Sequence, residues 1–138
     1  MRRTRTAAIT FAAFLCAATL ALSLSAAAAE PATVGPQIGT AACYSRRLVG
    51  HRTTSGERYN PNALTAAHGS IAMGSHVKVT NLQNGKSVVV VINDHMASHE
   101  KIIMDISRRA CRELDFPAGG EAKVKLEVVP STAAATAQ

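Results

Sequence analysis

Two runs of β-branched residues around an Asn-Gly pair constrain the fold of this 138-residue chain more than any other feature. Residues 77–80 precede Asn84-Gly85, and residues 87–90 follow it. Asn and Gly tolerate the positive φ angles of a tight turn, so the pattern predicts an antiparallel hairpin. With two further runs of the same kind, the sequence predicts strands over residues 39–45, 75–81, 86–93 and 122–129.

The core of these strands must be mainly aliphatic, because aromatic residues make up only 4% of the chain and Trp is absent. Val77, Val79 and residues 88–92 are expected to line it. Residues 123–128 alternate polar with apolar, as a half-exposed closing strand does. A core of Val, Ile, Leu and Ala favours a small barrel over an open sandwich, so the predicted fold is mainly β.

One helix is predicted over residues 107–114, with Ser107 as its N-cap and three arginines toward solvent. A second short helical turn is expected to begin at residues 60–62, with Leu64 packing inward.

Residues 1–29 have the pattern of a secretory signal peptide: three arginines, an apolar segment and a run of small residues. An uncleaved membrane anchor is the alternative. Cys16 lies within this segment behind Leu15, where a lipid-modified cysteine needs a small residue, and is expected to leave with the signal. We expect a flexible leader over residues 30–37, one domain over residues 38–129 and a disordered tail over residues 130–138.

The three signal arginines carry half of the formal net charge of +6, which leaves the exported part at +3. This mild excess slightly favours contact with anionic envelope polymers. The sequence has neither an arginine-rich helix nor a platform of aromatic residues, so nucleic acid is not an expected partner.

Two cysteines, Cys43 and Cys111, remain after the signal. An even number of cysteines in a small exported domain favours a Cys43–Cys111 disulfide; two separately buried thiols are the alternative.

Four short motifs occur in a defined order. TTSGERY contains Glu57, TAAH ends in His68, IND ends in Asp94, and DIS begins with Asp105. With the segments between them, these motifs resemble the rare lipoprotein A (RlpA)-like family over about residues 39–129. The resemblance implies a six-stranded double-psi β-barrel with one or two short helices, a fold shared with expansins.

Characterised members of that family are lytic transglycosylases that act on peptidoglycan, preferring glycan strands stripped of stem peptides. The resemblance therefore implies cleavage of the β-1,4 bond between N-acetylmuramic acid and N-acetylglucosamine. The muramyl 6-hydroxyl is the nucleophile, and the product carries a 1,6-anhydro end. The reaction needs proton transfer and stabilisation of an oxocarbenium-like charge, and it needs no metal or cofactor.

The resemblance gives roles to specific residues. Asp94 or Asp105 is the expected proton donor, made competent by a pKa raised in a partly desolvated groove. Glu57 and His68 are expected to orient the donor or bind sugar hydroxyls. The further residues expected to bind substrate are Tyr44, Thr54, Ser55 and Asn93.

Three of these residues also have a structural interpretation. Asp105 stands two positions before Ser107 and could cap the helix there. Glu57 could be a solvated turn residue. His68, before Gly69, could hold a turn by hydrogen bonding to the backbone.

The chain departs from the family after Asp94. Relatives usually continue Arg-Gly-Pro, whereas this chain has His95-Met96-Ala97, which removes a fixed cation and a rigid turn. His95 and His99 are four residues apart and could share a metal ion on a helix, but two histidines without a third ligand do not predict a metal site.

The leading hypothesis is an exported lytic transglycosylase, in the periplasm or at the cell wall, that acts as a monomer on glycan strands and keeps no membrane anchor after signal cleavage. A non-catalytic expansin-like wall-binding protein is the alternative. A secreted protein-binding module, such as an enzyme inhibitor, is a third.

Overall fold

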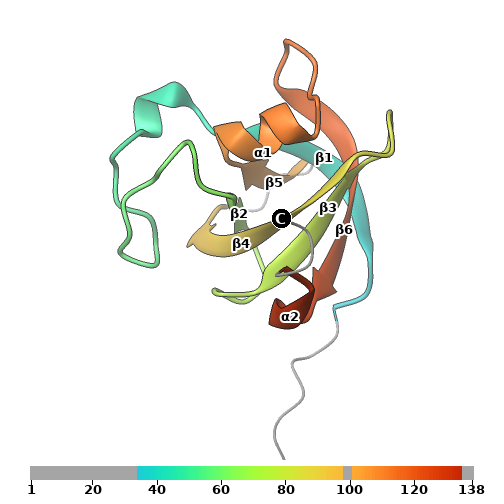
Figure 1. Cartoon of the computed structure of the whole chain (residues 1–138). Coiled ribbons are helices and arrows are strands. Elements are labelled where there is room, and N and C mark those ends of the chain that lie inside the picture. Colours follow the sequence, from blue (N-terminus) through green and yellow to red (C-terminus); the bar gives the residue numbers. More distant parts are fainter. Residues whose placement is uncertain (1–33, 98–100, 135–138) are drawn as a thin grey trace, which may run out of the picture. The chain divides into compact units, whose positions relative to one another are not determined.

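The computed structural model describes residues 34–97 and 101–134 of the chain, so the predicted signal peptide and Cys16 lie outside the described residues. The described residues form six strands and three short helices (Figure 1). In chain order these are β1 (Gln37–Cys43), the 3-10 helix η1 (Arg46–Leu48), β2 (Thr65–His68), β3 (His76–Asn81), β4 (Ser87–His95), β5 (Ile102–Ile106), α1 (Arg108–Glu113), β6 (Glu121–Val129) and α2 (Ser131–Ala134).

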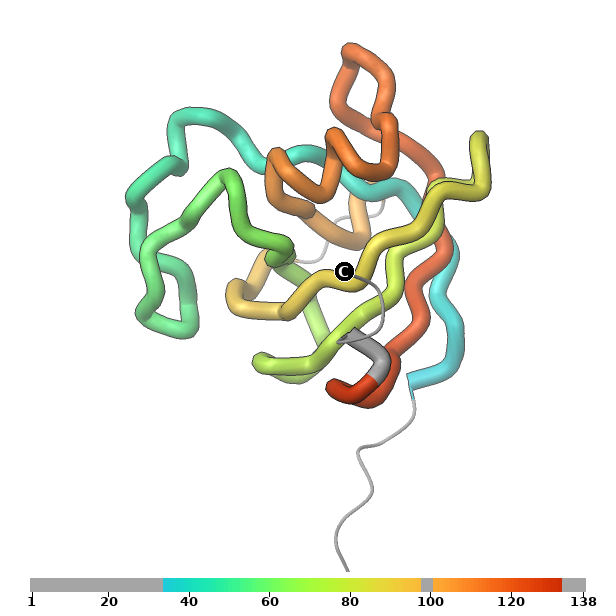
Figure 2. Tube along the Cα trace, in the orientation of Figure 1, coloured from blue at the N-terminus to red at the C-terminus, as the bar shows by residue number. Residues whose placement is uncertain are grey.

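The six strands close into a barrel in the order β1-β5-β2-β4-β3-β6. The pairs β1/β5 and β2/β4 are parallel, and the other four are antiparallel. The trace in Figure 2 shows the loop between β1 and β2 extending to one side of the barrel. The predicted six-stranded double-psi barrel is confirmed.

The four predicted strands correspond to β1, β3, β4 and β6, and the hairpin turns at Gly85, whose φ is +74°. The strands β2 and β5 were not predicted. The short helical turn expected to begin at residues 60–62 is present as a single turn, in which the Ala63 N–H donates to the Asn60 carbonyl at 3.2 Å, and it does not extend into a helix. Leu64 does pack against the core, as expected. Within the described residues, no helix is long and apolar enough to span a membrane.

The barrel interior is filled by aliphatic side chains from every strand, as the composition predicts. The residues with less than 2% exposure include Val77, Val79, Val90, Ile92, Met104, Ile106 and Val124. Packing is tight enough to select a glycine: a Cβ on Gly39 would lie 2.7 Å from side-chain atoms of Ile103. That distance is far inside van der Waals contact, so β1 can approach β5 here only without a side chain.

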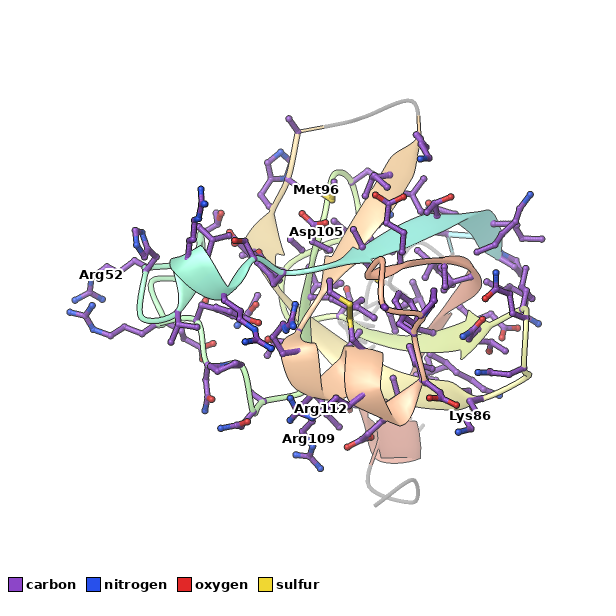
Figure 3. All side chains as sticks on the ribbon, turned by 90° about the horizontal axis from the view of Figure 1, so that it is seen from above. Arg52, Lys86, Met96, Asp105, Arg109 and Arg112 are labelled. Carbon is purple, nitrogen blue, oxygen red and sulfur yellow. A yellow bond between two sulfur atoms is a disulfide. The ribbon has the colours of Figure 1, made fainter. Side chains whose placement is uncertain are left out.

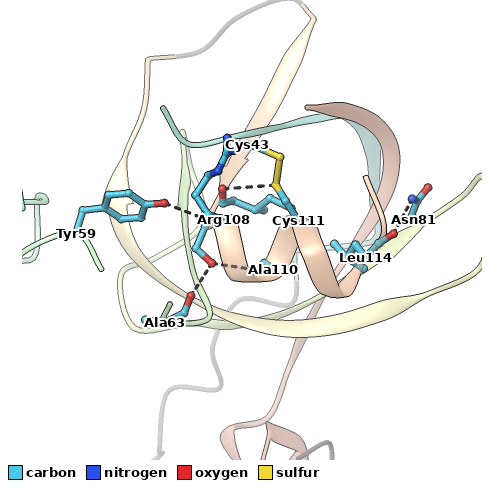
Figure 4. The surroundings of a disulfide bond; sticks show 10 residues. Cys43, Tyr59, Ala63, Asn81, Arg108, Ala110, Cys111 and Leu114 are labelled. Atoms are coloured by element: carbon cyan, nitrogen blue, oxygen red, sulfur yellow. Dashed lines mark hydrogen bonds between the residues drawn. A yellow bond between two sulfur atoms is a disulfide. The ribbon is translucent and has the colours of Figure 1, made fainter. Parts of the chain in front are cut away.

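Helix α1 is held at both ends, although it has only six residues (Figure 4). The Ser107 hydroxyl accepts from the Ala110 N–H and donates to the Ala63 carbonyl at 2.6 Å, which confirms it as the N-cap. At the other end, the Leu114 carbonyl accepts from the side-chain amides of Asn81 and Asn84. The turn that joins β3 to β4 therefore also anchors the helix.

Cys43 and Cys111 form a disulfide that joins the end of β1 to α1, as predicted (Figure 4). The bridge spans 68 positions of sequence, and Cys111 is buried in the core cluster. Closing a loop of this length restricts the unfolded chain by about 4 kcal/mol in the chain-entropy account.

We expect Cys43→Ser to lower the free energy of unfolding by about 4 kcal/mol, because the unfolded chain regains the entropy of the open loop. Urea denaturation of the oxidised proteins measures the difference. Dithiothreitol should destabilise the wild type to the level of the variant and leave the variant unchanged. Equal midpoints for the oxidised wild type and the variant would contradict a stabilising role for the bridge.

Candidate active site

An extra residue in β4 turns Asp94 to the outside of the barrel. Ala66 pairs with Ile92, but the next residue of β2, Ala67, pairs with Asp94. Ile92 faces the core, so in a regular strand Asp94, two residues later, would face it too. The bulge at Asn93 reverses this alternation.

Asp94 and Asp105 lie in one row across three strands on this outer face. Ala67 pairs with Asp94 on one side and with Asp105 on the other, and Asp105 pairs in turn with Ala42. Two strand spacings separate the Cα atoms of the two aspartates by roughly 10 Å. Ala67 lies between them, and its small side chain leaves room for other side chains to pack on this part of the sheet.

The Asp94 carboxylate accepts hydrogen bonds from four donors. The Tyr44 hydroxyl donates to Oδ2. The backbone N–H and the hydroxyl of Thr54 donate to Oδ1 at 2.9 and 2.7 Å, and the His95 N–H donates to the same oxygen at 2.9 Å. Every donor favours the ionised form.

Burial alone would raise the pKa of Asp94, but the hydrogen bonds from Tyr44, Thr54 and His95 outweigh it and hold the pKa below its ordinary value. The expectation of a raised pKa is therefore wrong for Asp94. That expectation took account of the desolvation of the carboxyl group but not of the hydrogen-bond donors that the fold places around it. Asp94 is a carboxylate at neutral pH.

A tight turn at residues 53–57 supplies the Thr54 donors. The Thr53 N–H donates to the Glu57 carbonyl at 2.8 Å, and Gly56 has a φ of +87°, which favours glycine. The turn is fixed to β4 because the Ser55 N–H donates to the Asn93 carbonyl at 3.1 Å. The Asn93 amide donates to Glu57 Oε2 at 3.1 Å, which holds this exposed carboxylate at the rim.

Tyr44 and Tyr59 form the floor of the site with Ala67. The two rings stack with centroids 4.7 Å apart, and all three side chains are buried in a small cluster outside the barrel core, against which Met96 packs. Burial, the hydrogen bond to Asp94, and the charges of Asp94 and Asp105 all raise the pKa of Tyr44. The negative charges of both carboxylates oppose ionisation of the Tyr44 hydroxyl, which donates its hydrogen bond to Asp94.

His68 lies one position beyond this row, where it pairs with His95 and Met104. Its Nδ1 accepts the N–H groups of Ser70 and Ile71 at 3.1 and 3.0 Å, which leaves the proton on Nε2. Burial and the nearby His95 lower its pKa, so the imidazole is neutral at pH 7. His68 and Met96 line a separate cavity of about 170 Å³.

The fold thus gathers Tyr44, Thr54, Asn93, Asp94 and Asp105, with Glu57 and Ser55 at the rim and His68 in the adjoining cavity. Figure 3 shows Met96 and Asp105 on the same side of the ribbon. Sequence reasoning missed the roles of Tyr59 and Met96. The Tyr59 side chain gave no signal because its partner, Tyr44, lies 15 positions earlier.

Among residues 34–97 and 101–134, no group of three or more His, Cys, Asp or Glu side chains is placed to hold a metal ion. His95 ends a strand, and His99 lies outside the described residues.

Three comparisons bear on this arrangement. Residues 37–126 match the family described as lytic transglycolase. The endolytic peptidoglycan transglycosylase RlpA of Neisseria meningitidis is 45% identical over 103 residues, which cover 74% of this chain and 43% of that protein. The chain therefore spans less than half the length of this relative.

Two solved structures share the fold at lower identity. A mutant expansin from Clavibacter michiganensis, in complex with cellohexaose, has a TM-score of 0.56 and 20% identity, with 70% of this chain and 51% of that chain covered. A Streptomyces papain inhibitor has a TM-score of 0.55 and 17% identity, with 73% and 100% covered.

The depressed pKa of Asp94 has a consequence for stability. The folded chain favours the carboxylate more than the unfolded chain does, so its contribution is complete above the ordinary carboxyl pKa and is lost as pH falls through the lower folded value. We expect the free energy of unfolding to fall more steeply below about pH 4 in the wild type than in Asp94→Asn. Urea denaturation between pH 7 and pH 2 measures the two slopes.

Tyr44→Phe removes one of the four donors and should give an intermediate slope. Parallel curves for the wild type and Asp94→Asn would show that the donors do not stabilise the carboxylate.

Proposed function

The chain belongs to the lytic transglycolase family, and from that premise we propose that it is an exported lytic transglycosylase acting on peptidoglycan glycan strands. The observation that carries the proposal is the pair of carboxyl groups in one row across the sheet, with Asp94 held ionised by four donors. Two carboxyl groups in different environments can divide the charge and proton roles of glycoside cleavage.

Asp105 is the proposed proton donor. Its proton passes to the glycosidic oxygen as the bond from that oxygen to C1 of the muramyl ring breaks. The 6-hydroxyl oxygen then bonds to C1, and its proton passes to the Asp105 carboxylate. Asp105 ends as it began, no water is consumed, and the product is a 1,6-anhydro-muramyl end.

Asp94 is the proposed electrostatic stabiliser. A carboxylate with a depressed pKa is a poor base, but its fixed negative charge lowers the energy of the positive charge that develops at C1. The four donors also fix its position, so the site needs no reorganisation during the reaction. Glu57 and Ser55 at the rim are proposed to bind sugar hydroxyls, and the Nε2–H of His68 to orient the strand.

Peptide-stripped strands are the proposed preferred substrate, and the periplasm or the cell wall the proposed location. The Cys43–Cys111 disulfide supports the location, because such bridges persist in oxidising compartments.

A non-catalytic glycan-binding function is the second candidate. It is favoured by His95-Met96-Ala97, which replaces the Arg-Gly-Pro of relatives beside Asp94. The expansin in complex with cellohexaose is a glycan-binding protein of the same fold.

We expect the purified protein to release products with anhydro-muramyl ends from peptide-stripped strands, detected by mass spectrometry. Asp105→Asn should remove the product signal, and Asp94→Asn should lower the rate by at least about a hundredfold, as loss of a preorganised electrostatic group does. Asp115→Asn, at an exposed aspartate paired with Lys86, is the matched control and should keep the wild-type rate.

Co-sedimentation with the same strands separates the two candidates. Retention on glycan without any anhydro product would favour the binding function. Equal rates for Asp105→Asn and Asp115→Asn would rule out Asp105 as the acid.

A further inference from the structure

A further cavity lies outside the aspartate row, between the end of β1 and helix α1. It has a volume of about 550 Å³, and its lining includes Arg46, Arg108 and Arg112. Both cysteines of the disulfide contribute to its wall (Figure 4). We call it the arginine cavity.

The charged side chains that line the arginine cavity are all positive. No Asp or Glu is among its lining residues. Among the ion pairs of the described residues, none involves Arg46, Arg108 or Arg112. Arg109, on the same helix, is different: it pairs with Glu113 at 2.8 Å and does not line the cavity.

Contacts within the protein restrict two of the cavity arginines before any ligand binds. Arg112 donates to the Asn62 side chain at 3.4 Å, and Arg108 is half-buried. Arg52, labelled in Figure 3, and Arg58 belong to the neighbouring loop, where each guanidinium donates to a backbone carbonyl. Residues 46–58 contain four arginines and one glutamate, so the approach to the cavity is also positive.

The cavity is connected to the aspartate row through the tyrosine floor. The backbone N–H of Arg108 donates to the Tyr59 hydroxyl at 3.3 Å. The Tyr59 ring stacks on the ring of Tyr44, whose hydroxyl donates to Asp94. The cavity thus lies next to the pair of tyrosines that holds Asp94.

We propose that the arginine cavity is an anion subsite that takes the free lactyl carboxylate of a muramyl residue next to the cleaved bond. This inference rests on the proposed function. A guanidinium cluster is matched to a carboxylate through charge-assisted hydrogen bonds. The lactyl group is an anion only when no stem peptide is attached, because the peptide bond converts the carboxylate to a neutral amide. The cavity thus gives a physical reason for a preference for stripped strands.

The test compares two tetrasaccharides. One is peptide-free and consists of two linked GlcNAc-MurNAc disaccharides; the other is chitotetraose, which has no lactyl group. Binding is measured by calorimetry in the Asp105→Asn background, which is proposed to block turnover, so the result does not depend on cleavage. We expect the muramyl compound to bind about tenfold more tightly, the size of one charge-assisted hydrogen bond.

Arg46→Gln with Arg112→Gln should remove this difference, while Arg109→Gln, the matched control, should keep it. Arg46 and Arg112 are exposed, so the double variant should retain the wild-type melting temperature, which is checked first. If the Asp105→Asn protein, with all its arginines intact, binds the two tetrasaccharides equally, the proposal is overturned.

A second arm distinguishes the carboxylate from the phosphate of other wall polymers. Poly(glycerol phosphate) at equal charge concentration should displace the muramyl compound weakly. If it binds more tightly than the muramyl compound, and the double variant abolishes that binding, the cavity is a phosphate site and the lactyl assignment is wrong.

Discussion

Parallel pairing with a one-residue bulge is the constraint on which the site depends. It occurs twice, once in β2/β4 and once in β1/β5. A closed barrel of six strands has an interior filled by side chains, so every strand must send alternate residues inward. The bulge in β4 breaks that alternation at one point and places Asp94 outside while Ile92 remains inside. The geometry of the carboxyl pair is thus a property of the sheet.

The turn at residues 53–57 supplies hydrogen-bond donors to Asp94, the carboxylate that the bulge turns outward. Its donors come from 40 positions earlier in the chain than Asp94, and they help to hold Asp94 as a carboxylate. Without them, burial would be opposed only by the hydrogen bonds from Tyr44 and His95, so the pKa of Asp94 would be higher. The loop therefore lowers the pKa of a carboxyl group that belongs to a distant strand.

The parts of the fold with strong local signals were predictable. The Asn84-Gly85 turn and the Ser107 cap are encoded within a few residues, and both were found. Strand β2, Thr-Ala-Ala-His, was missed because alanine has little preference for strands, and the segment is extended through its pairing with β4 and β5. The members of the site were named through their motifs. The pKa of Asp94 was mispredicted because it depends on contacts distant in sequence.

The disulfide links the shape of the arginine cavity to the redox conditions around the protein. Both sulfur-bearing residues form part of the wall of the arginine cavity, and one of them fastens the helix that presents Arg108 and Arg112. Bridges of this kind form where thiols are oxidised and are rare where glutathione keeps them reduced. In a reducing compartment the helix would lack this covalent link to β1, so the shape of the cavity depends on the redox state of the two cysteines.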